Sequence, residues 1–356
     1  MTEFVAGVTV RTARPDDAAE RARIAGFVAE QPGGTPFHLP AWGVATARAT
    51  GQRFAMLVAE RGDTLAAILP LTTVRSRLFG TALVSTGFGV AGGPLGDDAA
   101  AQAALIEQAL AIADEENSPT IELRGGPAPV GAGWTVDEGR YLGFVRPIAA
   151  DDAAELAAIP RKQRAEVRKA LATGFEVATG RSRRDLAEHF AVYGESVRNL
   201  GTPVFPPALF REVLDAFGPE GADILTVRHE GRPVASVLSL YWRGTVYPYW
   251  GGGTRAARAL RANDAMYFAL MRHARDRGCT AFDFGRSKAG TGPAAFKKNW
   301  GFTPQPLAYA TWTRDGAAPR DASPLNPKYR LKIAAWQRLP LAIANRVGPW
   351  IARGLG

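Results

Sequence analysis

Cysteine is almost absent from this 356-residue chain, which has Cys279 alone, and its four histidines stand far apart. A single cysteine excludes an internal disulfide and a thiolate metal cluster. The spacing of His38, His189, His229 and His273 fits no familiar set of metal ligands. We therefore expect neither a disulfide scaffold nor a bound metal ion.

Long apolar runs are also missing, because glycine, proline or charge interrupts each apolar segment. The start of the chain, MTEFVAGVTVRTARPDD, carries acidic residues where a signal peptide needs a basic start and an apolar stretch. These absences predict a cytoplasmic protein. Positive charge, in contrast, is abundant, with a formal net charge of +9. This charge favours a polyanionic partner, such as a nucleotide cofactor, RNA, an anionic lipid surface or an acidic glycan.

An internal repeat organises the chain. The segment LVAERGDTLAAILPL (57–71) aligns without a gap on TVRHEGRPVASVLSL (226–240), with Gly62 on Gly231. Each segment has an apolar strand, a charged turn with glycine and a second apolar strand, which is the pattern of a β-hairpin. Each hairpin is followed by a Gly-rich turn, a periodic apolar helix and a buried strand. The other matched pairs are 35–40 with 202–207, 100–116 with 263–278, and 120–125 with 280–285.

The repeat predicts an α/β fold with two tandem units, each with a mixed sheet flanked by helices. We assign the first unit to 1–130 and the second to 131–315, with the boundary in the segment 126–139, which is rich in glycine and proline. Residues 316–356 belong to neither copy and form a basic tail. The alternative is one large α/β protein whose halves are similar by chance.

Two motifs occur in the second copy only, FDFGRS (282–287) and AFKKNWGF (295–302). A tandem pair of units with these motifs resembles the FemAB family, whose domains have the Gcn5-related N-acetyltransferase (GNAT) fold. The segments 159–171 and 326–340 look more narrowly like FemAB-related proteins associated with PEP-CTERM and exosortase systems. The resemblance spans nearly the whole chain.

The resemblance implies that an acyl or aminoacyl group is transferred to an amine on a cell-envelope or exopolysaccharide-related acceptor. Its donor would be an acyl-CoA, an acyl carrier protein or an aminoacyl-tRNA. The GNAT phosphate motif, Q/R-x-x-G-x-G/A, is not intact, because RAARALRAND (255–264) has no glycine. This departure disfavours acetyl-CoA. A helix that opens at Asn263 or Asp264 would still offer its N-terminus to phosphates.

An amide-forming transferase has to stabilise an oxyanion and move protons, and it needs no enzyme nucleophile. The resemblance implies that Lys297 lies beside the transferred carbonyl, and the alternative is a solvated lysine on a basic turn. If the segment is extended, Lys298 points elsewhere. Phe296 packs against the donor or belongs to the core. Asp283 alternates with Phe282 and Phe284 and is either a proton acceptor or a partner in a salt bridge.

Further candidates lie on neighbouring strands. Arg286, Ser287 and Lys288 follow at the carboxyl end of a strand, where ligands usually bind in α/β sheets. Tyr247 and Tyr249 are expected on one face of YPYWGGG (247–253), with Trp250 on the other. These aromatic residues either border the site or pack in the core.

In the first copy, His38 and Trp42 are candidates to seat the acceptor, with a structural role as the alternative. In the second copy, Arg161, Arg164 and Arg168 form one stripe on a short predicted helix. Such a stripe suits contacts with the phosphates of RNA or of a nucleotide-linked substrate. Solvated helix surface is the other interpretation.

From 324 to 356 the chain has lysine and arginine but no acidic residue, interleaved with aromatic and aliphatic residues. This composition is typical of a helix in a membrane interface, so we expect peripheral contact with the inner membrane, with packing on the domains as the alternative. Two other functions compete with transfer. One is a non-catalytic scaffold that binds a glycan, a lipid-linked intermediate or a partner protein. The other is an RNA-binding module, although no known RNA motif is present.

Overall fold

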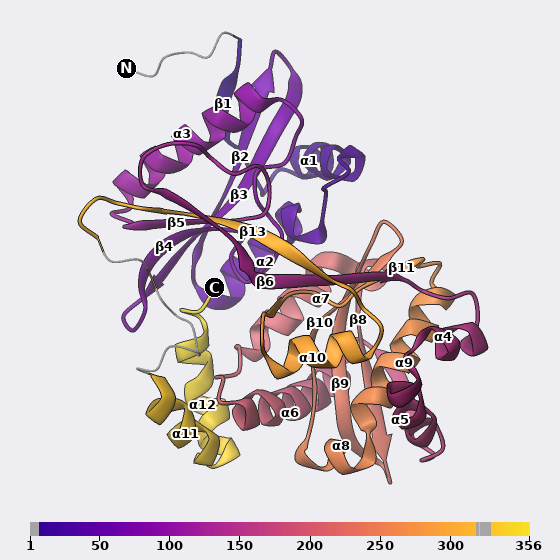
Figure 1. Ribbon diagram of the computed structural model, residues 1–356. Helices are drawn as coiled ribbons and strands as arrows, with labels where there is room; N and C mark the ends of the chain where they lie inside the picture. Colours follow the sequence, from indigo (N-terminus) through magenta and orange to yellow (C-terminus); the bar gives the residue numbers. More distant parts are fainter. Residues whose placement is uncertain (1–6, 318–319, 321–328) are drawn as a thin grey trace. The chain divides into compact units, whose positions relative to one another are not determined.

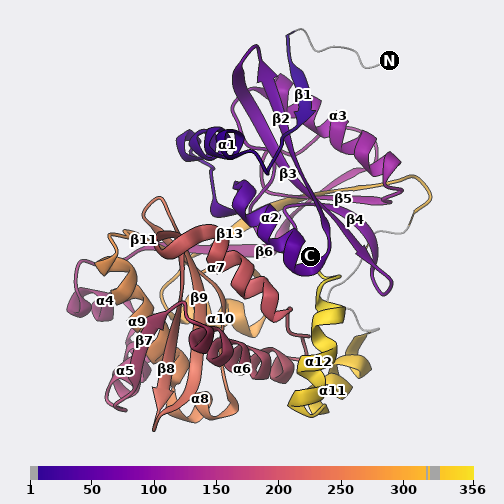
Figure 2. The same cartoon turned by 180° about the vertical axis from the view of Figure 1, so that it is seen from behind.

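The computed structural model describes residues 7–317, 320 and 329–356, and the chain divides into two compact units. Unit 1 comprises Met1–Glu138, Leu307–Ser323 and Ile351–Gly356. Unit 2 comprises Gly139–Pro306 and Pro324–Trp350. Each unit has a mixed sheet with helices packed on it (Figure 1), and Figure 2 shows the same elements from behind.

Unit 1 is built on a mixed sheet. In chain order its elements are β1 (Thr9–Thr12), α1 (Ala18–Glu30), the 3-10 helix η1 (Pro36–His38), α2 (Pro40–Thr50), β2 (Arg53–Arg61), β3 (Thr64–Ser76), β4 (Gly80–Ser85), α3 (Ala99–Glu115), β5 (Thr120–Arg124) and β13 (Pro304–Thr313). The strand order is β1-β2-β3-β4-β5-β13, in which β4 and β5 are parallel and the other neighbours are antiparallel. The side chains of Leu57 and Leu69 pack with α3, whereas Phe54 lies against Gly43 of α2. Helices α2 and α3 therefore cover opposite faces.

Unit 2 repeats this plan. Its elements are β6 (Trp134–Pro147), α4 (Asp152–Ala158), α5 (Arg161–Leu171), β7 (Glu176–Gly180), α6 (Arg183–Leu200), α7 (Pro207–Gly221), β8 (Ala222–His229), β9 (Arg232–Trp242), β10 (Thr245–Gly253), α8 (Arg255–Leu260), α9 (Ala262–Asp276), β11 (Ala281–Asp283), β12 (Ser287–Lys288), α10 (Gly292–Asn299), α11 (Arg330–Arg338) and α12 (Leu341–Ala352). The strand order is β7-β8-β9-β10-β11-β6, and only β10 and β11 are parallel.

The last strand of each sheet comes from the other half of the chain. The strand that follows β5 in sequence is β6, and it pairs with β11 of unit 2. The strand that follows α10 is β13, and it pairs with β5 of unit 1. The compact units therefore differ from the contiguous segments 1–130 and 131–315 at β13, which lies in the second segment but pairs in unit 1. Strand β6 lies in the second segment and pairs in unit 2. Local sequence patterns do not record such long-range pairing.

The two hairpins correspond, but with an offset one residue smaller than the ungapped alignment. The loop residues are 62–63 in the first hairpin and 230–231 in the second, so Gly62 comes first in its loop and Gly231 comes second in its own. Structural alignment therefore places Leu57 on Leu225, and both side chains are buried under the covering helix. A shift of one residue reverses the face of a strand, so aligning the glycines exchanges inward and outward residues.

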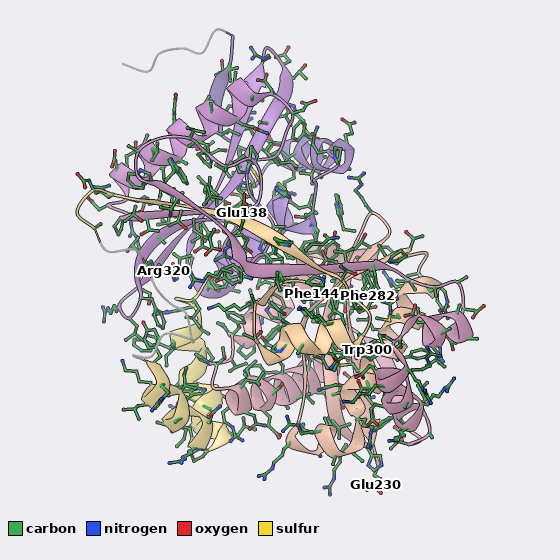
Figure 3. The ribbon with its side chains drawn as sticks, viewed as in Figure 1. Glu138, Phe144, Glu230, Phe282, Trp300 and Arg320 are labelled. Atoms are coloured by element: carbon green, nitrogen blue, oxygen red, sulfur yellow. The ribbon has the colours of Figure 1, made fainter. Side chains whose placement is uncertain are left out.

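Each unit has its own apolar core on the side of its long helix. In α3 the residues Ala101, Leu105 and Ala109 are fully buried, and Asp98 caps the helix through the amides of its first turn. In unit 2 the core contains Phe144, Phe282 and Trp300, which come from β6, β11 and the end of α10 (Figure 3). Burial of each large apolar side chain contributes about 1.5–3 kcal/mol, so the helical cover of each sheet is a main source of stability.

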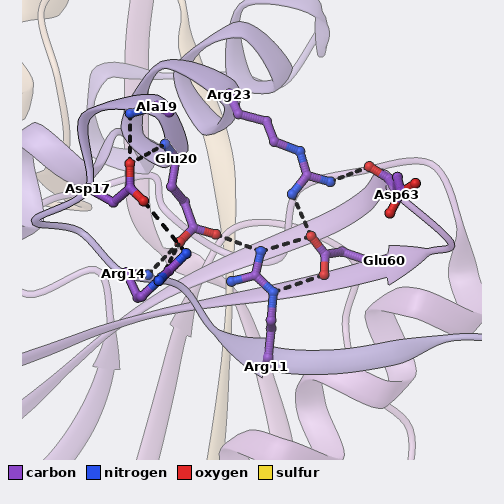
Figure 4. A network of polar contacts seen from close by, with 8 residues as sticks. All are labelled: Arg11, Arg14, Asp17, Ala19, Glu20, Arg23, Glu60 and Asp63. Atoms are coloured by element: carbon purple, nitrogen blue, oxygen red, sulfur yellow. Dashed lines mark hydrogen bonds and ion pairs between the residues drawn. The ribbon is translucent and has the colours of Figure 1, made fainter.

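An ion-pair network joins β1, α1 and β2 in unit 1 (Figure 4). Both Arg11 and Arg23 hydrogen-bond to the carboxylate of Glu60, at 2.9 and 2.6 Å. Arg11 also contacts Glu20 at 2.6 Å. The hydrogen bond from Arg11 lowers the pKa of Glu60, so the carboxylate stays ionised. This network fixes the edge strand to the first helix.

Helix α11 of the basic tail packs on α6 within unit 2, whereas the last residues of the tail, Ile351–Gly356, belong to unit 1. Arg198 of α6 donates to the carbonyl oxygen of Gln337 at 3.1 Å, and the amide of Gln337 donates to Asn199 at 3.2 Å. These contacts of α11 support the alternative that the tail packs on the domains. Among the described residues, no helix is both long enough and apolar enough to span a membrane.

Candidate active site

The strands β10 and β11 run together over a short stretch and then separate. They pair through Thr245–Val246 of β10 and Ala281–Phe282 of β11. Beyond these pairs β10 continues along β9 to Gly253, whereas β11 ends at Asp283. The carboxyl end of β11 is therefore the point where the sheet opens, and ligands of α/β sheets usually bind at such a point.

Lys297 lies on a helix, α10, so the segment is not extended, which was the condition for the predicted direction of Lys298. The buried residues Ala294, Lys297 and Trp300 recur every third position, so one side of α10 and its C-cap faces the core. The Nζ atom of Lys297 donates to the carbonyl oxygens of Gly285 and Arg286, each at 3.1 Å. The lysine is thereby held at the carboxyl end of β11, whereas its neighbour Lys298 is exposed.

Burial changes the ionisation of both candidate groups. It lowers the pKa of Lys297 to about 8, against the effect of the Asp283 carboxylate. It raises the pKa of Asp283 to about 6, although the Gly285 amide, which donates to Oδ1 at 2.8 Å, and Lys297 both oppose this. Burial, and then Asp283, raise the pKa of Tyr247. Near neutral pH the site therefore holds a carboxylate, an ammonium group and a neutral phenol.

Two basic candidates stack on Tyr141 of β6. The guanidinium carbon of Arg286 lies 4.4 Å from the ring centroid of Tyr141, and Nζ of Lys288 lies 5.8 Å from it. Ser287 is buried and pairs with Leu142 in the register between β12 and β6. Sequence reasoning missed Tyr141, because its strand was not expected beside this motif.

Phe296 lies among core aromatic residues. Its ring centroid is 5.8 Å from Tyr267, 6.1 Å from Phe284 and 6.2 Å from Trp300. These contacts account for Phe296 as a core residue. Packing against a donor stays a prediction.

A β-bulge changes the aromatic faces of β10. Tyr247 and Trp250 pair with Leu240 and Leu238, which are two residues apart on β9, so they share a face. Tyr249 is the extra residue of the bulge. The expectation that Trp250 lies opposite both tyrosines is wrong for this reason.

The arginine stripe of α5 divides into two kinds of residue. Arg164 donates through Nε to the carbonyl oxygen of Ile159 and through Nη2 to that of Ala157, each at 3.0 Å. Arg164 therefore caps the C-terminus of α4. Arg161 and Arg168 are exposed and are the members of the stripe that suit a polyanion.

The side chains of α5 cover the start of α9. The helix begins before Asn263 and Asp264, with Arg261 at its N-cap in a left-handed conformation (φ 59°), so the expected opening is wrong. Arg261 forms an ion pair with Glu166, and Gln163 donates to Asp264 at 2.6 Å. Burial raises the pKa of Asp264 to about 6. Sequence reasoning missed this group, because its members lie far apart in the chain.

His38 and Trp42 bond within unit 1. The Nε2 atom of His38 lies 3.1 Å from the carbonyl oxygen of Gly93, and Nδ1 lies 2.9 Å from the hydroxyl of Thr35. Burial lowers the pKa of His38 to about 4, so the ring is neutral near neutral pH. Trp42 is fully buried and donates to Gly87 at 3.0 Å. These contacts account for both residues as parts of the structure of unit 1.

The corresponding end of unit 1 has a different construction. Residues 125–133, between β5 and β6, are all described and contain no helix, so α10 has no counterpart there. Arg124, the last residue of β5, is buried and donates to the carbonyl oxygens of Thr86 and Gly89 at 3.2 and 2.7 Å. It also donates to the carbonyl oxygen of Gly356 at 3.2 Å, so the segment after β4 and the last residue of the chain occupy this end of unit 1. Among the described residues, no three His, Cys, Asp or Glu side chains gather into a group suited to a metal ion.

Residues 161–298 match the family model of the acetyltransferase (GNAT) domain. Over these residues, unit 2 is similar to a GNAT domain. The matched range contains Asp283 and ends one residue after Lys297, so it includes both members of the candidate pair. No curated protein sequence matches the chain.

Solved structures show that the similarity in fold extends beyond the GNAT domain to both units. The crystal structure of FemX is 16% identical, with a TM-score of 0.66 over 91% of this chain and 100% of that one. A tandem GNAT protein from the clavulanic acid biosynthesis pathway is 13% identical, with a TM-score of 0.56 over 88% and 100%. The C-terminal domain of a putative lysylphosphatidylglycerol synthetase from Agrobacterium fabrum is 14% identical, with a TM-score of 0.54 over 84% and 92%. The expected α/β fold with tandem GNAT-like units is confirmed.

Proposed function

We propose that unit 2 transfers an acyl or aminoacyl group to an amine and so forms an amide. The observation that carries this proposal is the placement of Lys297 and Asp283 at the end of β11, where the sheet of the GNAT domain opens. An ammonium group has three N–H donors, and Lys297 uses two on carbonyl oxygens. The third N–H group can donate to the oxyanion, and the two hydrogen bonds already hold the ammonium group in position.

The reaction balances with these two groups. The nitrogen of the acceptor amine attacks the donor carbonyl, a C–N bond forms, and the ester or thioester bond of the donor breaks. Asp283 accepts the proton that the amine loses and passes it to the departing hydroxyl or thiol group, which returns Asp283 to its carboxylate form. Lys297 offsets the negative charge on the carbonyl oxygen during the step.

The donor is an acyl-CoA, an acyl carrier protein or an aminoacyl-tRNA, and the structure favours the last two. Gln163 and Glu166 cover the N-terminus of α9, the helix end that would otherwise attract phosphates. Arg161 and Arg168 remain exposed on α5 for a larger polyanion.

For the acceptor, we favour a cell-envelope or exopolysaccharide-related molecule at the cytoplasmic face of the inner membrane. The support is the resemblance of 159–171 and 326–340 to PEP-CTERM-associated proteins and the basic tail. The alternative is a non-catalytic GNAT-like scaffold that binds a glycan, a lipid-linked intermediate or a partner protein. Such a scaffold has no need of a buried, oriented lysine.

Mass spectrometry of molecules that co-purify with the chain, followed by incubation of the donor found with amine acceptors, tests the proposal. We expect an acylated carrier protein or aminoacyl-tRNA and a new amide product that Lys297→Met abolishes or greatly slows. A bound glycan or protein with no amide product from any of the three donor classes would favour the scaffold.

A further inference from the structure

Helix α12 has two different apolar faces, of which one is used inside unit 2. Ala344 is 1% exposed. Asn345 lies against Gly194 of α6, and Gly348 lies against Val204, where added side-chain atoms would clash. The spacing of three and four residues places these positions on one side of the helix. This inner face is already covered.

The opposite side of α12 stays exposed although it is apolar. Ile343, Val347 and Trp350 are 48%, 40% and 49% exposed, and their spacing of four and three residues forms one stripe. Arg346 belongs to the same stripe and is exposed. We call Ile343, Arg346, Val347 and Trp350 the tail face. A contiguous apolar stripe at the surface usually marks an interaction site.

The charged residues of 324–356, the segment that holds the tail face, are all basic. No acidic residue occurs between 324 and 356, and exposed basic residues precede the tail face on α11. Leu331, on the same short helix, is 80% exposed. Tryptophan and aliphatic side chains beside arginines suit the boundary between lipid headgroups and acyl chains. The exposed basic residues are Arg330, Lys332, Arg338 and Arg346.

We infer that the tail face binds an anionic lipid bilayer, with α12 lying in the plane of the headgroups. Ile343, Val347 and Trp350 enter the interface, and Arg346 contacts lipid phosphates. The length of α12 and the break at Pro340 suit a helix that lies on a bilayer. The absence of acidic residues from 324–356 favours an anionic lipid surface over a protein partner, whose complementary surface would be of mixed charge. This inference stands independently of the transfer chemistry.

Sedimentation of the full chain with vesicles tests the inference, using phosphatidylcholine alone and phosphatidylcholine mixed with phosphatidylglycerol. We expect binding to the mixed vesicles that added salt weakens. The variant Ile343→Ser/Val347→Ser/Trp350→Ser should bind at least tenfold more weakly. Arg346→Ser should bind about fivefold more weakly, because a basic residue near an anionic surface contributes about that factor.

The matched control is Val177→Ser, because Val177 is 46% exposed on the edge strand β7 of the same unit. It should bind as the wild type does. Since all these side chains are exposed, circular dichroism and melting should show folded variants. No binding of the wild type to the anionic vesicles, or equal binding by the triple variant, would overturn the inference. A co-purifying protein that only the triple variant loses, without vesicle binding, would replace the bilayer by a protein partner.

Discussion

Asp283 of β11 and Lys297 of α10 act on each other's ionisation across two elements of unit 2. The carboxylate raises the pKa of Lys297, and the ammonium lowers that of Asp283. Burial is the larger effect on each and has the opposite sign, so the two pKa values approach each other, at about 6 and about 8. Both groups are charged only in the interval between these values.

The pair predicts a bell-shaped pH profile for transfer. Asp283 accepts a proton only as a carboxylate, above about pH 6, and Lys297 offsets the oxyanion only as an ammonium, below about pH 8. We expect kcat/KM to fall on both sides of this window. Asp283→Asn should lower the rate and remove the acidic limb, and Lys297→Arg should move the alkaline limb to higher pH. An unchanged acidic limb in Asp283→Asn would show that Asp283 is not the base.

His38 should make the stability of unit 1 depend on pH. Its pKa is 6.5 when unfolded and about 4 when folded, because burial favours the neutral ring. The contribution of the neutral His38 ring to the free energy of unfolding is complete above pH 6.5. It falls by about 3 kcal/mol as the pH decreases towards about 4. Urea unfolding of the wild type and His38→Gln should therefore give a difference that changes by this amount over that interval. A constant difference would contradict a buried neutral ring.

The same variant separates the two roles considered for His38. A structural role predicts unchanged KM for the acceptor in folded His38→Gln at neutral pH. A raised KM with unchanged melting temperature would support a role in seating the acceptor.

Substitution by alanine should lower the stability of the fold at Arg164 but leave it nearly unchanged at Arg168. Arg164→Ala leaves two carbonyl oxygens without their donor and should destabilise the fold by about 1–2 kcal/mol. Arg168→Ala removes an exposed side chain and should change stability by less than about 0.5 kcal/mol. If the donor is a tRNA, Arg168→Ala should reduce the slope of log affinity against log salt by about 1. An unchanged slope would place the RNA elsewhere.

The local patterns predicted the hairpins, the long helices α3 and α9 and the duplication of the unit. Periodicity and turn residues act over a few positions, so they are readable in one sequence. The bulge at Tyr249 and the position of Gly231 in its loop depend on the partner strand. The predicted faces of the β10 aromatic residues and the predicted alignment of the two hairpins were therefore wrong. The pairing of β13 with β5 of unit 1 joins distant segments and was also missed.

In the candidate site, too, local features were predicted from the sequence and contacts between distant segments were not. The position of Lys297 after the buried strand followed from the motif, whereas its helical setting did not. Tyr141 contributes a ring to Arg286, and Gln163 contributes an amide to Asp264, across long separations in sequence. Such contacts follow from the pairing of β6 and the packing of α5, so no spacing in the sequence records them.

The most direct test of the proposed function compares Lys297→Met with Lys298→Met in single-turnover amide formation, using the donor that co-purifies. Methionine fills the volume of the lysine stem in both variants. In Lys297→Met the carbonyl oxygens of Gly285 and Arg286 lose their donor, which should cost about 1–2 kcal/mol, so melting curves are recorded to verify that both variants are folded. Lys297→Met should lose about a hundredfold in rate, on the order of 3 kcal/mol, because one fixed oxyanion contact is gone. Lys298 is exposed on the same helix, and its variant should keep nearly the full rate. Equal rates in the wild type and Lys297→Met would contradict a catalytic site at the end of β11.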